Sequence, residues 1–185
     1  MSEAIATCSF EDFLEAEQLA DRRHELVGGR VYAMAGGSER HDLIAGLIYE
    51  LVAPEARSRG CRPFISNRLV RTMSGNAYYP DVFVACGGAP HRLYESSPVL
   101  VVEFLSRSTA DLDRREKAVG YAASESLSLL LLVDPDARRI EAARPAAGKI
   151  GAWAAYGPGD VVATEFGDID VDTLYDVIDR TATTR

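Results

Sequence analysis

The chain has 185 residues, about the length of one domain, and its 47% hydrophobic and 26% charged composition is that of an ordinary globular protein. Acidic residues outnumber basic residues by 28 to 20, giving a formal net charge of −8. This balance argues against indiscriminate nucleic-acid binding, although it allows a local basic patch or a bound metal ion.

The cysteines and the N-terminus bear on the cellular compartment. Cys8, Cys61 and Cys86 are odd in number and lack CxxC spacing, which favours neither a disulfide framework nor a zinc site. We therefore expect small core residues in a reducing compartment. The N-terminus lacks a signal-peptide pattern and no apolar run has the length of a membrane span, so we expect a cytoplasmic protein without membrane contact.

Helical and strand patterns alternate along the chain without a linker or an internal repeat. We therefore expect a single α/β domain over residues 1–185. In chain order the predicted elements are a helix capped by Ser9, a hairpin of strands 25–27 and 30–34 around Gly28-Gly29, a helix from Glu39 to about Arg59 with an apolar stripe that includes Leu43 and Leu51, strands at 64–65, 69–71, 79–85 and 99–105, a helix over 110–123, strands at 127–133, 138–144 and 161–166, and a short C-terminal helix.

Glu103 interrupts the otherwise apolar run from Val99 to Leu105. A run of this length, rich in valine, is typical of a strand buried on both faces. Carboxylates are almost never fully buried without compensation, and an unpaired charge there would cost on the order of several kcal/mol. We therefore expect a metal ion, a cation or a strong hydrogen-bond donor beside Glu103.

Asp81 is the second candidate carboxylate. It follows Pro80, opens the strand 82–85 and precedes Glu103 by 22 residues, which leaves room for a loop and a return strand. If the two strands are neighbours, the carboxylates converge, and such pairs commonly hold Mg²⁺ or Mn²⁺. The alternative, that Asp81 caps a turn and Glu103 meets an arginine, is left open by these residues alone.

Lys117 adds a positive charge to this set. The chain has only two lysines among its 20 basic residues, and Lys117 lies in the helix that follows the Glu103 strand. Lysine is a compact point charge whose pKa responds to burial. Asp113 and Tyr121, four residues to either side, share its helix face. The alternative is a solvated pair between Lys117 and Asp113.

The order of these motifs resembles a known family. It resembles the PD-(D/E)xK nuclease superfamily and, within it, the Uma-two type of restriction endonucleases. The resemblance implies a restriction-endonuclease-like core, a central mixed β-sheet flanked by helices. The residues that carry it are Pro80-Asp81, Val102-Glu103-Phe104-Leu105-Ser106, Ser108-Thr109, Asp113-Arg114, Lys117, Tyr121 and Leu132-Val133-Asp134-Pro135, with Phe10–Leu14, Glu25-Leu26, Gly29, Val31 and His41 in the N-terminal half.

The resemblance implies roles for the central residues. Asp81 and Glu103 would bind Mg²⁺ or Mn²⁺, and Lys117 would orient or deprotonate the attacking water or stabilise the developing charge. The simplest superfamily motif has its lysine two residues after the glutamate, where this chain has Leu105. In the family that the chain resembles, the following helix supplies the lysine.

Three further residues are supporting candidates. Glu25 would contact the metal through water, or would be a solvated residue at a hairpin start. Tyr121 would hydrogen-bond within the site, or would be an ordinary half-buried tyrosine. His41 matches a family position, and we expect it to be no metal ligand because the start of a helix offers it a capping role.

The resemblance therefore implies a metal-dependent endonuclease that hydrolyses DNA, and we expect a homodimer because duplex DNA has two strands. The alternatives are a catalytically silent scaffold or protein-binding module with the same fold, and a hydrolase of other phosphoesters. Two groups of arginines would either contact phosphates or form a solvated face. They are Arg57, Arg59, Arg62, Arg68 and Arg71, and, beside the proposed site, Arg107, Arg114 and Arg115.

Overall fold

The computed structural model describes residues 7–34, 36–88, 91–105 and 116–182. Its helices are α1 (Phe10–Leu19), α2 (Glu39–Ser58), α4 (Ala118–Ala122) and α5 (Val171–Ala182). Its strands are β1 (His24–Val27), β2 (Arg30–Ala33), β3 (Arg62–Ile65), β4 (Leu69–Arg71), β5 (Ala77–Tyr78), β6 (Val82–Ala85), β7 (Tyr94–Glu95), β8 (Pro98–Phe104), β9 (Leu129–Asp134), β10 (Arg139–Ala143), β11 (Trp153–Tyr156), β12 (Val161–Val162) and β13 (Ile169–Asp170).

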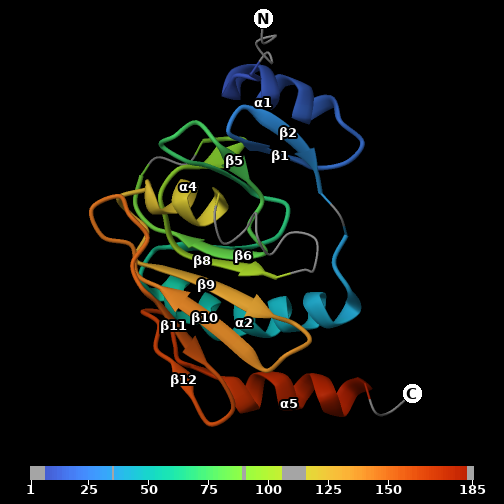
Figure 1. The fold of residues 1–185 in the computed structure, drawn as a ribbon, viewed down its shortest axis with the longest axis vertical. Helices are drawn as coiled ribbons and strands as arrows, with labels where there is room; N and C mark the ends of the chain where they lie inside the picture. The colour runs from blue at the N-terminus through green and yellow to red at the C-terminus, as the bar shows by residue number, and fades with distance from the viewer. Residues whose placement is uncertain (1–6, 35, 89–90, 106–115, 183–185) are drawn as a thin grey trace, which may run out of the picture.

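A six-stranded mixed sheet, in the order β11-β10-β9-β8-β6-β3, forms the centre of the molecule. The β8–β9 pair is parallel and the other pairs are antiparallel. Helices α2 and α5 cover one face, and α4 and a five-stranded sheet, in the order β2-β1-β5-β4-β7, lie on the other (Figure 1). The predicted α/β fold with a central mixed sheet flanked by helices is therefore confirmed.

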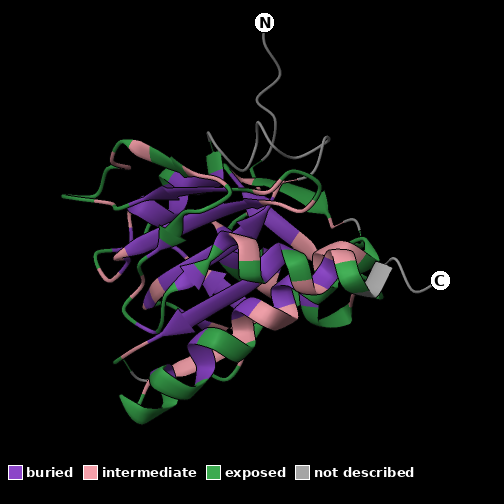
Figure 2. Cartoon of the chain, turned by 90° about the horizontal axis from the view of Figure 1, so that it is seen from below, coloured by how far each residue is buried: buried purple, intermediate pink, exposed green. Residues whose placement is uncertain are grey.

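Apart from Glu103 and Asp134, the strands β8 and β9 are apolar because both of their faces are covered. Val102 and Leu131 pack with α2 and α5 in one cluster, whereas Val101 and Leu130 pack with α4 in another. Figure 2, seen from below, shows mostly purple strands behind helices that carry green on their outer sides. Glu103 thus lies on a strand that solvent does not reach from either face.

Capping residues set the bounds of the two long helices. The Ser9 and Ser38 side chains accept hydrogen bonds from the backbone N–H groups three residues on, at 3.1 and 3.2 Å. The buried face of α2 is Ile44, Ala45, Ile48, Val52, Ala53 and Ala56. The predicted stripe was wrong for Leu43 and Leu51, which are 39% and 46% exposed, because small alanines occupy the closest contacts instead. None of the described helices is long and apolar enough to cross a membrane.

A long bent hairpin connects the two sheets. One arm runs from β3 in the six-stranded sheet to β4 in the five-stranded sheet, and the other returns from β5 to β6. Ile65 pairs with Val82, but Val70 pairs with Tyr78, so the four residues 66–69 lie opposite the three residues 79–81. The longer arm therefore carries one extra residue where the chain passes from one sheet to the other.

A disulfide joins Cys61 to Cys86, with their Cα atoms 4.4 Å apart. The expectation that these two cysteines are reduced was therefore wrong, and they give no support for a reducing compartment. Spacing along the sequence could not show the bond, which follows from strand pairing. Arg62 pairs with Ala85, and continuing this register by one residue brings the two cysteines opposite each other.

We expect the Cys61→Ser, Cys86→Ser double variant to lose about 3 kcal/mol of unfolding free energy, because the bond closes a loop of 25 residues that contains the whole bent hairpin. Urea denaturation with and without a reductant measures the loss. Cys8→Ser, at the free cysteine, is the matched control and should leave the midpoint unchanged. Equal midpoints for oxidised and reduced wild-type protein would contradict this expectation.

Candidate active site

Glu103 is buried, at 4% exposure, and meets two groups from the α4 region. The Tyr121 hydroxyl donates a hydrogen bond of 2.7 Å to Oε1 of Glu103. The Lys117 ammonium lies 3.6 Å from Oε2. Both partners were candidates from the sequence, and the structure places them with Glu103 on the face of the sheet opposite α2.

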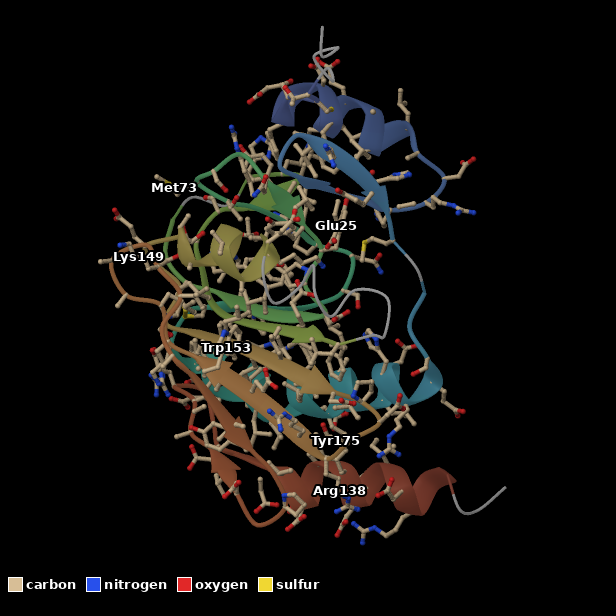
Figure 3. The ribbon with its side chains drawn as sticks, in the orientation of Figure 1. Glu25, Met73, Arg138, Lys149, Trp153 and Tyr175 are labelled. Atoms are coloured by element: carbon tan, nitrogen blue, oxygen red, sulfur yellow. A yellow bond between two sulfur atoms is a disulfide. The ribbon has the colours of Figure 1, made fainter. Side chains whose placement is uncertain are left out.

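Lys117 and Glu25 form a buried ion pair. Nζ of Lys117, a residue 7% exposed, lies 2.9 Å from Oε2 of Glu25, a residue 5% exposed, and Oε1 of Glu25 accepts a hydrogen bond from the backbone N–H of Tyr79. Figure 3 shows Glu25 on the hairpin strand β1, within the molecule near α4. The solvated alternatives for Lys117 and Glu25 were therefore wrong, whereas Asp113 lies outside the described residues.

Close packing fixes the position of α4 and hence of Lys117, which lies in a π-helical turn immediately before it. The rings of Tyr78 and Tyr121 are 4.8 Å apart, and both side chains are fully buried. A Cβ atom on Gly120 would lie 2.3 Å from the Tyr78 hydroxyl, so this helix approaches Tyr78 only because residue 120 is glycine. The sequence predicted a role for neither Tyr78 nor Gly120, although a glycine within a buried helix was a signal of close backbone approach.

Asp81 lies beside the same strand end. Its Oδ2 accepts a hydrogen bond of 2.8 Å from the backbone N–H of Phe104. Val82 pairs with Val102, so continuing the register by one residue places Asp81 opposite Glu103. Residues opposite each other in antiparallel strands share a face, with Cβ atoms roughly 5 Å apart. The expected neighbouring strands for Asp81 and Glu103 are thus present.

His41, from the first turn of α2, holds Asp81 from the other side. Its Nε2 lies 3.0 Å from Oδ1 of Asp81, and its ring stacks on that of Phe104 at 4.5 Å. The hydrogen bond with Asp81 raises the pKa of His41, although partial burial opposes the shift. His41 therefore contacts a candidate metal ligand instead of only capping its helix.

Burial also keeps the tyrosines of the site protonated. It raises the pKa of the Tyr121 hydroxyl well above its ordinary value, and the nearby negative charge of Glu103 acts in the same direction. Tyr121 therefore remains a hydrogen-bond donor to Glu103 over the whole range of neutral pH. Its orientation toward the carboxylate follows from that protonation state.

The donor chemistry of the site suits a hard divalent cation. Asp81 and Glu103 offer carboxylate oxygens, and Mg²⁺ is typically bound through one or two carboxylates together with waters and substrate oxygens. Among residues 7–34, 36–88, 91–105 and 116–182 there is no group of three or more His, Cys, Asp or Glu side chains that could hold a metal. Asp81 and Glu103 would therefore hold such an ion together with waters and substrate oxygens.

An open cleft of about 280 Å³ begins at Asp81. Four chain segments line it: the base of the β1–β2 hairpin, the start of α2, the turn between β3 and β4, and the segment before β6. Ser66 and Asn67 in that turn have φ values of 47° and 51°, a conformation that non-glycine residues rarely adopt. The Ser66 N–H donates to the Asp81 carbonyl, which ties the turn to the site.

Several arginines that were considered for phosphate contacts have structural roles. Arg62 and Arg68 each lie 2.8 Å from the carboxylate of Glu95, a residue 3% exposed. Arg59 pairs with Glu55, Arg57 donates to the Tyr49 hydroxyl and Arg71 lies over the Phe10 ring. Arg107, Arg114 and Arg115 lie outside the described residues.

A family model described as "Uma2: Putative restriction endonuclease" matches residues 10–165. The chain belongs to the Uma2 family. One relative, the "Uncharacterized protein slr1290" of Synechocystis sp., is 31% identical over 71% of this chain and 70% of its own length. Another, the "Uncharacterized protein sll1609" of the same organism, is 28% identical over 70% of this chain and 76% of its own length.

The fold of this Uma2 protein is similar to that of a solved structure. The crystal structure of a "putative nuclease belonging to DUF820" from Anabaena variabilis superposes with a TM-score of 0.74. The match covers 91% of this chain and 97% of that chain at 16% sequence identity. At this identity the likeness shows the fold, which is restriction-endonuclease-like as the sequence predicted.

We expect Gly120→Ala to destabilise the protein by about 1–3 kcal/mol, because the new methyl group has no room beside Tyr78. Tyr78→Phe should cost little alone, since the Tyr78 hydroxyl has no hydrogen-bond partner among the described residues. Because it removes the atom nearest to the new methyl group, Tyr78→Phe should restore part of the stability of Gly120→Ala. Additive losses in a double-mutant cycle of urea midpoints would contradict the contact.

The raised pKa of His41 predicts a pH-dependent contribution to the stability of the metal-free protein. A histidine with a raised folded-state pKa stabilises fully below its unfolded pKa of about 6.5, and this stabilisation is lost as the pH rises through the folded-state value. Wild type should therefore exceed His41→Gln in melting temperature most at about pH 5, and the difference should shrink toward about pH 8. A constant difference over this range would contradict the ion pair with Asp81.

Proposed function

We propose that this Uma2 protein is a metal-dependent endonuclease that hydrolyses DNA phosphodiester bonds. The observation that carries the proposal is the buried ammonium of Lys117, which lies 3.6 Å from Glu103. Glu103 is near the end of β8, where Asp81 accepts a hydrogen bond from the Phe104 N–H. A structural ion pair would need only one acid. Here one lysine meets two buried acids, and a third carboxylate lies on the neighbouring strand. The family description is consistent with this function.

Asp81 and Glu103 would hold Mg²⁺ or Mn²⁺. When bound, the ion supplies Lewis-acid polarisation of the phosphodiester and a water with a lowered pKa. Lys117 would orient that water or stabilise the charge that develops on the phosphoryl oxygens. Its own position depends on Glu25, which holds the ammonium at 2.9 Å.

Two further residues would set the orientation of the metal ligands. Tyr121 donates to one oxygen of Glu103 and leaves the other oxygen toward Lys117. His41 occupies one oxygen of Asp81, and the Phe104 N–H occupies the other. These contacts would orient the two carboxylates as metal ligands.

The assembly that we propose for cleavage of duplex DNA is a homodimer in which each copy forms one restriction-endonuclease-like domain over residues 1–185. The two strands of a duplex are related by twofold symmetry, and a twofold dimer presents one site to each. Light scattering on the purified protein tests the oligomeric state. A monomer at all concentrations, with cleavage confined to one strand, would contradict the dimer.

We expect plasmid DNA to be cut with Mg²⁺ or Mn²⁺, and cutting to stop with EDTA. Asp81→Asn, Glu103→Gln and Lys117→Met should each lower the rate at least a hundredfold, the scale on which a group that acts in the transition state contributes. Lys149→Met is the matched control. Lys149, the other lysine, is exposed on a loop at the left edge of Figure 3, away from Glu25. Undiminished cutting by an Asp81→Asn, Glu103→Gln double variant would refute the proposed site.

A second candidate function is a catalytically silent scaffold that uses the same fold. One observation favours it: the oxygens of both carboxylates already have protein partners in Lys117, Tyr121, His41 and the Phe104 N–H. Calorimetric titration with Mn²⁺ separates the two functions. A binding heat that is lost in Glu103→Gln supports the nuclease, and absence of heat supports the scaffold.

A further inference from the structure

The cleft beside Asp81 is the described cavity nearest to the proposed chemistry. Asp81 and His41 lie along it, and Arg23 comes from the base of the β1–β2 hairpin. Its volume of about 280 Å³ is near the lower limit for small-molecule pockets and far too small for the width of a duplex. A cleft of this size beside a hydrolytic site accommodates a short part of one nucleic-acid strand.

Arg23 is held in a defined orientation at this cleft. Its guanidinium lies 5.3 Å from the centroid of the Tyr79 ring, and its backbone carbonyl accepts a hydrogen bond from Met34, another residue of the cleft. Tyr79 itself is buried, donates its hydroxyl to Glu17 and donates its backbone N–H to Glu25. The ring beneath Arg23 is therefore fixed to the same network that holds Lys117.

The charge of Arg23 remains available to a ligand. Its side chain is 48% exposed, and its described ion pair, with Glu17, is long at 3.9 Å. Glu17 takes its closer hydrogen bonds from His24 and Tyr79. A guanidinium has five N–H donors in a planar fork, so stacking on an aromatic face leaves the edge free for a phosphate.

Arg23 is also the one Arg or Lys among the described residues that line this cleft. The other acidic and basic groups of the lining are Asp81, Asp42 and His41. A phosphodiester brought to Asp81 therefore meets carboxylates unless a cation compensates them. The metal ion would neutralise the cleaved phosphate, but its field falls off toward the next phosphate of the strand.

We propose that Arg23 binds a phosphate of the DNA strand adjacent to the phosphodiester cleaved at Asp81, with the intervening part of the strand in the cleft. This inference rests on the proposed nuclease function. It assigns Arg23 to substrate binding, and the planar fork of its guanidinium to the two oxygens of one phosphate. Arg23 acts on binding of the substrate and takes no part in the chemical step.

The test is a fluorescence-anisotropy titration of a labelled DNA duplex with Ca²⁺ in place of Mg²⁺, so that a hard cation compensates the carboxylates of the cleft. Gel electrophoresis verifies that the duplex stays uncut. Arg23→Gln removes the charge but keeps a planar polar group over Tyr79. We expect roughly ten- to a hundredfold weaker binding, the scale of a hydrogen bond to a charged group. The logarithm of the association constant falls as the logarithm of the salt concentration rises, and the magnitude of this slope should decrease by about 1 in Arg23→Gln. Arg23→Lys should restore the slope but only part of the affinity.

Arg22→Gln is the matched control, because Arg22 is exposed next to Arg23 in the sequence but does not line the cleft. It should bind DNA like wild type, and all variants should share the melting temperature of wild type. In cleavage assays Arg23→Gln should raise KM and leave kcat within about twofold of wild type. Wild-type binding by Arg23→Gln, or an equal loss in Arg22→Gln, overturns the inference while the nuclease stands. Absence of DNA binding by wild type overturns the DNA substrate itself, and the inference with it.

Discussion

The buried ion cluster of Glu25, Lys117 and Glu103 is the constraint on which the rest of the site depends. Taking each ion out of water costs several kcal/mol, so the two acids depend on the ammonium and the ammonium depends on the acids. The cluster also joins three separate parts of the fold, because β1, β8 and the turn before α4 each contribute one member. The five-stranded sheet, the central sheet and the helix are thereby fixed around one point. Among the described residues, the cluster thus brings one ammonium against two buried carboxylates.

The sequence was sufficient to locate most of this cluster. An acid within the run Val99–Leu105 has few physical explanations, and a rare lysine on the following helix restricts them further. The central elements were predicted for the same reason, since β8 and β9 are apolar on both faces. Glu25 was harder to assign, because a glutamate at the start of a hairpin is usually solvated. Only the packing of one sheet against the other decides that its side chain points inward.

The features that could not be predicted all depend on contacts between distant segments. The cysteine bond follows from the register of β3 and β6, which no spacing rule contains. The roles of Arg62 and Arg68, which are half-buried, follow from Glu95, a buried acid 33 and 27 residues away. Tyr79 looked like an ordinary strand residue, yet its ring supports Arg23 and its backbone holds Glu25. Each case involves a pair whose members are unremarkable alone.

The extra residue in the longer arm of the bent hairpin has a consequence for how the family can vary. The four residues 66–69 span the same distance as the three residues 79–81, so the two arms tolerate changes in length only as a matched set. Removing one residue from the longer arm would turn every later side chain of β4 to the opposite face, which would take Leu69 and Val70 out of the two separate clusters in which they are buried. Insertions should therefore accumulate at the Thr72–Asn76 tip, where the chain reverses direction. The segments 66–69 and 79–81, which connect the two sheets beside Asp81, should keep their lengths even among relatives whose sequences have otherwise diverged.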